Sequence, residues 1–174
     1  GVQTCALPIF KLQFGDVKGD VLNVLPPQRA GDIARTSGLI TANNRWCGVD
    51  WQTMESTAVK GVHVLGDATL SANLMPKSAS MANQHGKVAA AAIVAMMKGQ
   101  PLVAEPMMMN TCYSFVDGKN VIHVASVHQY STADKTMSVV KGSGGLSDKP
   151  SEIDRKSTRL NSSHSSVSRM PSSA

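Results

Sequence analysis

The feature that most constrains the fold is a long apolar segment near the middle of the chain, with "VAAAAIVAMM" at residues 88–97 as its centre. The pattern predicts a helix from about Ser80 to Lys98, and its almost continuous apolar surface predicts burial on all sides. Gly99 and Pro101 should end this helix. The apolar run is too short and too rich in alanine to predict a membrane span.

Strand patterns precede the predicted helix. Residues 17–25, "VKGDVLNVL", are typical of a strand that ends at the prolines in positions 26 and 27. A short helix is expected in "QRAGDIARTSGL", ending at Gly38. Residues 61–67, "GVHVLGD", are nearly all apolar, as in a strand that is buried on both faces. The order strand, loop and long helix predicts an α/β nucleotide-binding fold.

A second, smaller unit is predicted after residues 101–106, "PLVAEP", which are typical of a linker. The segment "CYSFV", the turn "DGKN" and the alternating "VIHVASVHQY" predict an antiparallel hairpin. The following "KGSGGLSDKP" is typical of a loop. We therefore expect an α+β unit with a β-hairpin to follow the α/β part.

The two ends of the chain resemble translated sequencing-adapter DNA: "GVQTCALPI" at residues 1–9 and "DRKSTRLNSSHSSVSRMPSSA" at residues 154–174. A natural, disordered serine-rich tail is the alternative for the second segment. Without these ends, 13 basic and 11 acidic residues remain, a net charge of +2 instead of +5. The basic residues do not cluster, so we expect no nucleic-acid partner.

Gly66 and Asp67 follow the predicted strand at residues 61–67. At the carboxyl end of a parallel strand, glycine lets a ligand approach the backbone and aspartate can accept hydrogen bonds from sugar-like hydroxyls. The alternative is a turn or helix-cap aspartate. The positive N-terminus of the next helix would favour the negative charge of a reduced flavin.

Four segments together resemble the flavoprotein subunit of flavocytochrome c sulfide dehydrogenase: "DVLNVLPPQRAG", "GVHVLGDAT", "MPKSASMANQHGKVAAAAIVAMMKG" and "NTCYSFVDGKNVIHVASVHQY". The resemblance runs from about Phe10 to Glu152. It implies part of a disulfide-reductase-like FAD flavoprotein with two dinucleotide-binding domains. Residues 10–100 would be the C-terminal part of the dinucleotide-binding region, and residues 101–153 an incomplete C-terminal flavin-binding domain.

The resemblance also implies roles for individual residues. Asp67, with Gly66 and Ala68, would bind FAD hydroxyls, while Pro76, Lys77 and Ser78 would form the loop beside the isoalloxazine ring. Cys112 would be one of two cysteines in a redox-active disulfide. Sulfide would attack this disulfide, and the electrons would pass through FAD to a cytochrome c subunit. Such proteins work in the periplasm, where disulfides persist.

Several features of the family have no counterpart between residues 10 and 153: the GxGxxG phosphate loop, the second redox cysteine, the cysteine that attaches FAD covalently, and a final helix with a tryptophan. We therefore expect this segment alone to be inactive. Two alternatives remain. One is a sulfide:quinone oxidoreductase-type flavoenzyme, and the other is a folded interaction module without chemistry of its own.

The remaining candidate residues have ordinary structural explanations. Apart from the resemblance, Cys112 would be a small core residue, and Cys47 is expected to be structural. A disulfide between them stays open, because sequence spacing does not decide it. Lys77 is either a cation beside the flavin or a solvated loop lysine.

His123 and His128 are five positions apart on one predicted strand, so they should face opposite ways and not share a metal ion. Three consecutive methionines, 107–109, could suggest soft-metal binding, but a linker that packs against the core is the favoured interpretation.

Overall fold

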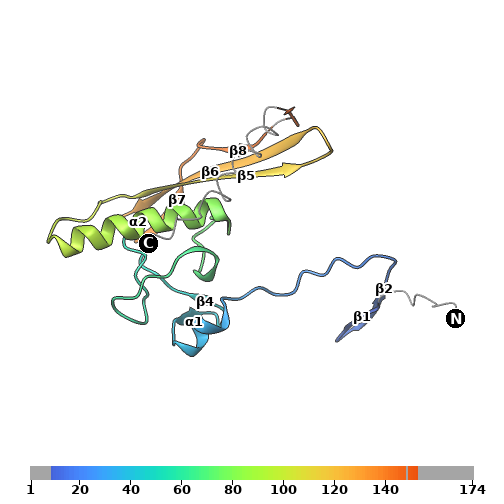
Figure 1. The fold of residues 1–174 in the computed structure, drawn as a ribbon, viewed down its shortest axis with the longest axis horizontal. Coiled ribbons are helices and arrows are strands. Elements are labelled where there is room, and N and C mark those ends of the chain that lie inside the picture. The colour runs from blue at the N-terminus through green and yellow to red at the C-terminus, as the bar shows by residue number, and fades with distance from the viewer. Residues whose placement is uncertain (1–8, 148, 153–174) are drawn as a thin grey trace, which may run out of the picture.

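The computed structural model describes residues 9–147 and 149–152 as a mixture of helices and strands (Figure 1). The mixed α and β character expected from the sequence is confirmed. All ladders between the described strands are antiparallel, and the one described parallel pairing is an isolated bridge between Cys47 and Thr69. The two end segments expected to be adapter-derived lie outside the described residues, except for Ile9.

The chain begins with a small exposed hairpin of β1 (Ile9–Leu12) and β2 (Gly15–Lys18). The strand predicted at residues 17–25 is wrong beyond Lys18. Val21 and Leu25 are 87% and 85% exposed, and no strand lies beside them in the described chain. An apolar run that has neither a ladder partner nor a packing surface gains nothing from the extended conformation.

The short helix predicted before Gly38 is confirmed as α1 (Asp32–Thr36). It turns the buried side chain of Ala34 inward, and Asp32 forms ion pairs with Arg29 and Arg35. After α1, β3 (Ile40–Ala42) and β4 (Trp46–Cys47) form a second small hairpin.

The segment predicted as a buried strand at residues 61–67 is not a strand. It holds one isolated bridge, between Glu55 and His63, and then the 3₁₀ helix η1 (Gly66–Ala68). Val64 is buried, but Leu65 is 41% exposed. The backbone of this segment bonds instead to the preceding loop, through Val64 N–H to the carbonyl of Met54 at 3.0 Å.

The long helix is confirmed as α2 (Ala79–Met97), with Lys98 as its C-cap and Gly99 in the left-handed region directly after it. Its expected burial on all sides is wrong. The buried residues recur every three or four positions and so form a single face, whereas Val94 and Met97 are 48% and 83% exposed. The buried face consists of Met81, His85, Ala89 and Ala92.

The predicted hairpin is confirmed and longer than expected. It consists of β5 (Met107–Phe115) and β6 (Val121–Ser131), and α2 lies along this sheet (Figure 1). Backbone N–H groups of Lys119 and Asn120 donate to the Asp117 carboxylate and close the turn. The expectation that residues 107–109 are a linker is wrong, because they form the start of β5.

Two short strands complete the sheet. β7 (Thr136–Val139) and β8 (Gly145–Leu146) both pair with β6, on the edge that β5 leaves free. The "KGSGGLSDKP" segment, expected to be a loop, therefore contributes β8. Side chains at even positions of β5 face α2, so Met108 is fully buried while its neighbours Met107 and Met109 are more than half exposed.

Candidate functional site

The predicted site residues lie around the first turns of α2. The 3₁₀ helix η1 packs against α2 in the structure. At Gly66, the backbone has a φ of +67°, and a Cβ there would stand 3.2 Å from the Cβ of Ala82. The N–H of Gly66 donates to Nδ1 of His85 at 3.0 Å. Glycine is therefore required here by backbone conformation and by close helix contact.

Asp67 lies in η1 at the edge of a cavity of about 260 Å³. Its carboxylate is exposed and accepts no hydrogen bond from the described residues. Two cationic side chains, an indole ring, the Asp67 carboxylate and the backbone around residue 30 surround this cavity. It is lined by Gln28, Arg29, Ala30, Gly31, Trp46, Asp67, Ala68 and Lys77.

Lys77 is fixed to the protein by its ammonium group. Nζ donates to the backbone carbonyls of Asp67 at 2.9 Å and Thr69 at 2.5 Å, and it lies 3.8 Å from the ring centroid of Trp46. Burial lowers the pKa of Lys77, against the opposite effect of Asp67 and Cys47. Lys77 is thus an exposed loop lysine whose ammonium group is held by the protein, and its predicted place beside a flavin stays a prediction.

Ser78 is the N-cap of α2, directly after half-buried Pro76 and exposed Lys77. Its Oγ accepts from the N–H of Met81 at 3.0 Å, as an N-cap serine should. The same hydroxyl donates to Oδ1 of Asn110 in β5 at 2.5 Å. One short side chain therefore both starts the helix and ties it to the sheet.

Cys112 comes close to this helix end through Asn110. The Asn110 side chain is 2% exposed, and its Nδ2 donates to Sγ of Cys112 at 3.4 Å. The two side chains share one face of β5, because they are two positions apart. Sequence reasoning missed Asn110. The signal was a polar residue at an inward position, between Met108 and Cys112 in the period-two pattern.

His85 is a second residue that sequence reasoning missed, since it stood inside the apolar helix pattern. Its ring is 3% exposed and packs edge-on against Trp51, with ring centroids 5.6 Å apart. Burial, assisted by the Lys77 charge, lowers the pKa of His85 to about 4, although Asp67 acts in the opposite direction. The imidazole is thus neutral at pH 7. Because Nδ1 accepts from Gly66, the ring proton is on Nε2.

Both described cysteines are free thiols, so the disulfide left open between Cys47 and Cys112 is not formed. Cys47 is fully buried, as expected for a structural residue. Burial raises the pKa of the Cys47 thiol, with Lys77 opposing that effect. Cys112 is only half-buried and is the more accessible of the two.

The two strand histidines lie on opposite faces, as predicted from their spacing. His128 is fully buried, and His123 is half-buried and packs against Tyr113, with ring centroids 6.1 Å apart. Burial lowers the pKa of His128. No group of three His, Cys, Asp or Glu side chains in the described residues is arranged to hold a metal ion.

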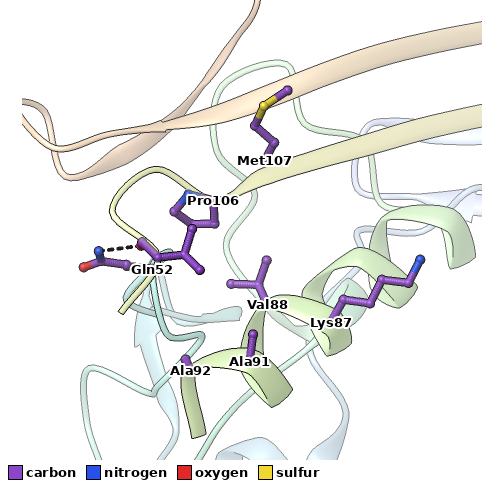
Figure 2. Close-up of a pocket in the computed structure, with 8 residues that line it drawn as sticks. Gln52, Lys87, Val88, Ala91, Ala92, Pro106 and Met107 are labelled. Atoms are coloured by element: carbon purple, nitrogen blue, oxygen red, sulfur yellow. Dashed lines mark hydrogen bonds between the residues drawn. The ribbon is translucent and has the colours of Figure 1, made fainter. Parts of the chain in front are cut away.

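A separate apolar cavity of about 210 Å³ lies between α2 and the start of β5 (Figure 2). Val88, Ala91 and Ala92 project from α2 toward Pro106 and Met107, while Gln52 donates to the carbonyl of Val103 at the rim. None of the predicted site residues lines this cavity. The candidate chemistry therefore belongs to the N-terminal end of α2.

Residues 104–165 match the family model described as flavocytochrome c sulphide dehydrogenase, flavin-binding. The matched segment is thus similar to a flavin-binding domain of this family. The segment contains β5, β6, β7 and β8, and with them Asn110 and Cys112. The resemblance to the flavoprotein subunit is thereby confirmed over about a third of the chain, and a flavin agrees with FAD as the expected cofactor. Among the described residues, no helix is long and apolar enough to cross a membrane.

Proposed function

We propose that this chain is part of an FAD-dependent sulfide dehydrogenase in which Cys112 is one of two redox-active cysteines. The observation that carries the proposal is the path from the N-cap of α2 through Ser78 and Asn110 to Cys112. This path places a half-buried thiol at the positive end of a long helix, inside the segment that matches a flavin-binding domain.

The residues around the start of α2 have the chemistry that FAD requires. The unbonded Asp67 carboxylate is an acceptor for hydroxyl groups of the cofactor. Lys77 and the first backbone N–H groups of α2 supply positive potential for a ring system that gains negative charge on reduction. When bound, FAD supplies a site that takes up two electrons and releases them one at a time.

The chemistry at Cys112 is thiol–disulfide exchange followed by oxidation. Hydrosulfide attacks the disulfide between Cys112 and a second cysteine, so one S–S bond breaks, another forms to the incoming sulfur, and one cysteine leaves as a thiolate. The hydrosulfide proton goes to solvent. When the disulfide re-forms, a second hydrosulfide would take the added sulfur as polysulfide, at the oxidation level of elemental sulfur, and bound FAD would serve as the acceptor of the two electrons released.

The larger assembly is part of the same proposal. Residues 10–100 would belong to a two-domain dinucleotide-binding flavoprotein, and a cytochrome c subunit would receive the electrons. The periplasm fits such a protein, because a redox-active disulfide needs an oxidising compartment. The family name, which joins flavin, cytochrome c and sulphide, supports this partner and this substrate.

The test uses the complete flavoprotein subunit that contains this chain, under anaerobic conditions. Sulfide should bleach the visible absorbance of the bound flavin, and added cytochrome c should restore it. The Cys112→Ser variant should keep its flavin and still be bleached by dithionite, but not by sulfide. Cys47→Ala is the matched control, and it should respond to sulfide as the natural protein does.

Three other results would contradict, in turn, the role of Cys112, the binding of flavin and the role of cytochrome c. Bleaching of Cys112→Ser by sulfide would remove Cys112 from the electron path. A natural protein that folds without flavin would favour a non-catalytic interaction module. If a soluble quinone restored the absorbance and cytochrome c did not, the enzyme would be of the sulfide:quinone type.

A further inference from the structure

The buried amide of Asn110 links Ser78 to Cys112, and it lies where a polar side chain is costly unless its hydrogen bonds are satisfied. Its side chain is 2% exposed on the inner face of β5, two positions from fully buried Met108. An amide left unsatisfied in such a place costs about 1–3 kcal/mol. Its hydrogen bonds to Ser78 and Cys112 avoid that cost.

The direction of these hydrogen bonds is fixed by the helix. The N–H of Met81 donates to Oγ of Ser78, so the Ser78 hydroxyl directs its own proton to Oδ1 of Asn110. The amide oxygen accepts from Ser78, and Nδ2 donates to Sγ of Cys112 at 3.4 Å. The protonated thiol of Cys112 can also donate to the same Oδ1, at 3.6 Å, whereas a deprotonated sulfur can only accept, and Nδ2 is then its donor. All three donors point the same way, from the positive end of α2 toward the sulfur, and such chains polarise one another.

We propose that Asn110 is a positioning residue that holds Cys112 toward the start of α2 and stabilises its sulfur as a thiolate. The inference rests on the proposed redox role of Cys112. The thiolate is the leaving group and the nucleophile of thiol–disulfide exchange, so a donor directed at it favours both steps. Hydrogen bonds to a charged acceptor are about twice as strong as neutral ones.

The hydrogen bond from Ser78 also connects Asn110 to the start of α2. It couples the start of α2 to the cysteine, so the helix end and the sulfur share one geometry. Cys112 pairs across the sheet with Val124, which is 45% exposed and offers the sulfur no hydrogen bond. Among the described residues, Asn110 is the donor whose side chain reaches Sγ.

The experiment measures Cys112 in the full chain after reduction and removal of the reductant. We would follow alkylation of Cys112 by iodoacetamide with peptide mapping, and the ultraviolet absorbance of the thiolate at one mildly alkaline pH. Asn110→Asp keeps the shape and the acceptor for Ser78 but replaces the N–H donors by a negative charge. We expect alkylation to slow by about tenfold or more, and the thiolate absorbance to fall.

Two further variants keep the test decisive. Ser78→Ala leaves Asn110 in place but removes the group that orients its amide, so alkylation should slow by a smaller factor, about threefold. Thr111→Val changes the neighbouring residue on the opposite face of β5 and should leave both readouts unchanged. Circular dichroism would establish that each variant is folded.

If folded Asn110→Asp is alkylated at the natural rate with an unchanged thiolate absorbance, Asn110 only fills space and the inference is wrong. This readout uses neither sulfide nor flavin, so it is independent of the bleaching test. A chain in which Asn110 controls the thiol while Cys112→Ser still reacts with sulfide would overturn the proposed function and leave the positioning role standing.

Discussion

Two hydrophobic clusters of this chain are built in opposite ways. The methionine core joins α2 and the sheet, whose backbone hydrogen bonds are regular, to three loop residues, Trp51, Met54 and Met75. The Cys47 cluster lies under loops and isolated bridges. The methionine core consists of Trp51, Met54, Met75, Met81, Ala89, Met108, Tyr130 and Met137. The Cys47 cluster consists of Ala30, Ala34, Cys47 and Val64.

The size of the side chains follows from this difference in backbone. Where α2 and the sheet meet, the long unbranched side chains of Met81, Met108 and Met137 fill the space together with Met54 and Met75 from the loops. Around Cys47 the chain segments themselves come close: Leu70 N–H donates to the Cys47 carbonyl at 2.8 Å, and a Cβ at Gly48 would stand 2.6 Å from Oγ1 of Thr41. The fully enclosed side chains of this cluster are therefore small, and larger ones such as Trp46 and Ile40 pack against it from outside.

The candidate site lies at the border of the two clusters. Lys77 contacts Trp46 and the η1 backbone on the side of the Cys47 cluster, and Ser78 begins the helix that covers the methionine core. The loops carry the exposed polar groups, and the helix and sheet hold the buried relay to Cys112. The candidate site therefore combines residues from the loops with residues from the helix and the sheet.

The largest effect should come from the methionine core. Met108→Ala removes a side chain with 0% exposure and should lower the free energy of unfolding by about 2–5 kcal/mol. Val64→Ala, in the Cys47 cluster, removes less apolar volume and should lower the free energy of unfolding by about 1–2 kcal/mol. Urea unfolding gives both values. Met109→Ala is the control, because Met109 is 57% exposed on the other face of β5.

If Met108→Ala and Val64→Ala lowered the free energy of unfolding equally, the two clusters would contribute alike to stability, and the contrast between them would be wrong. A large cost for Met109→Ala would show that a further surface covers the outer face of the sheet.

The regular half of the molecule could be predicted because its signals are local. A serine cap, an alanine-rich run and Gly99 define α2, and "DGKN" closes a hairpin whose strands are neighbours in the sequence. The predicted boundaries of α2 differ from the observed ones by a single residue at each end.

The irregular half was predicted poorly because its structure depends on distant partners. The apolar pattern of residues 61–67 matches a buried strand, but its backbone bonds to residues 54–56 and its end turns into η1. An apolar pattern predicts that a segment is buried, but it does not predict which residues form hydrogen bonds with its backbone. Asn110 was missed for a related reason: its importance lies in Ser78, which is 32 positions away.

An effect of intermediate size should come from His85, which lies between Trp51 of the methionine core and the backbone of Gly66. Its pKa is about 4 in the folded chain against an ordinary 6.5, so the unfolded chain binds more protons between these pH values. The free energy of unfolding should therefore be fully retained above about pH 6.5 and fall by up to about 3 kcal/mol as the pH drops to 4.

His85→Gln tests this pH dependence. Glutamine does not titrate, yet its side-chain oxygen can accept the Gly66 N–H, so urea unfolding of the variant at pH 7 and pH 5 should show a smaller loss than the natural chain. Part of the loss should remain, because burial also lowers the pKa of His128. An identical loss in both proteins would exclude His85 as a source of acid sensitivity.

The smallest effects should come from two glycines on facing sides of the η1–α2 contact. Gly86→Ala, inside α2, should raise the free energy of unfolding by about 0.5–1 kcal/mol, since its new Cβ would only touch Leu65 at 4.0 Å. Gly66→Ala should lower it by about 1–2 kcal/mol, because of its left-handed φ and the close Ala82 Cβ. The same substitution thus acts with opposite sign in the regular and the irregular half. A neutral Gly66→Ala, read by urea unfolding, would mean that the backbone beside Asp67 is free to relax, and the left-handed conformation at Gly66 would then not be a constraint on the fold.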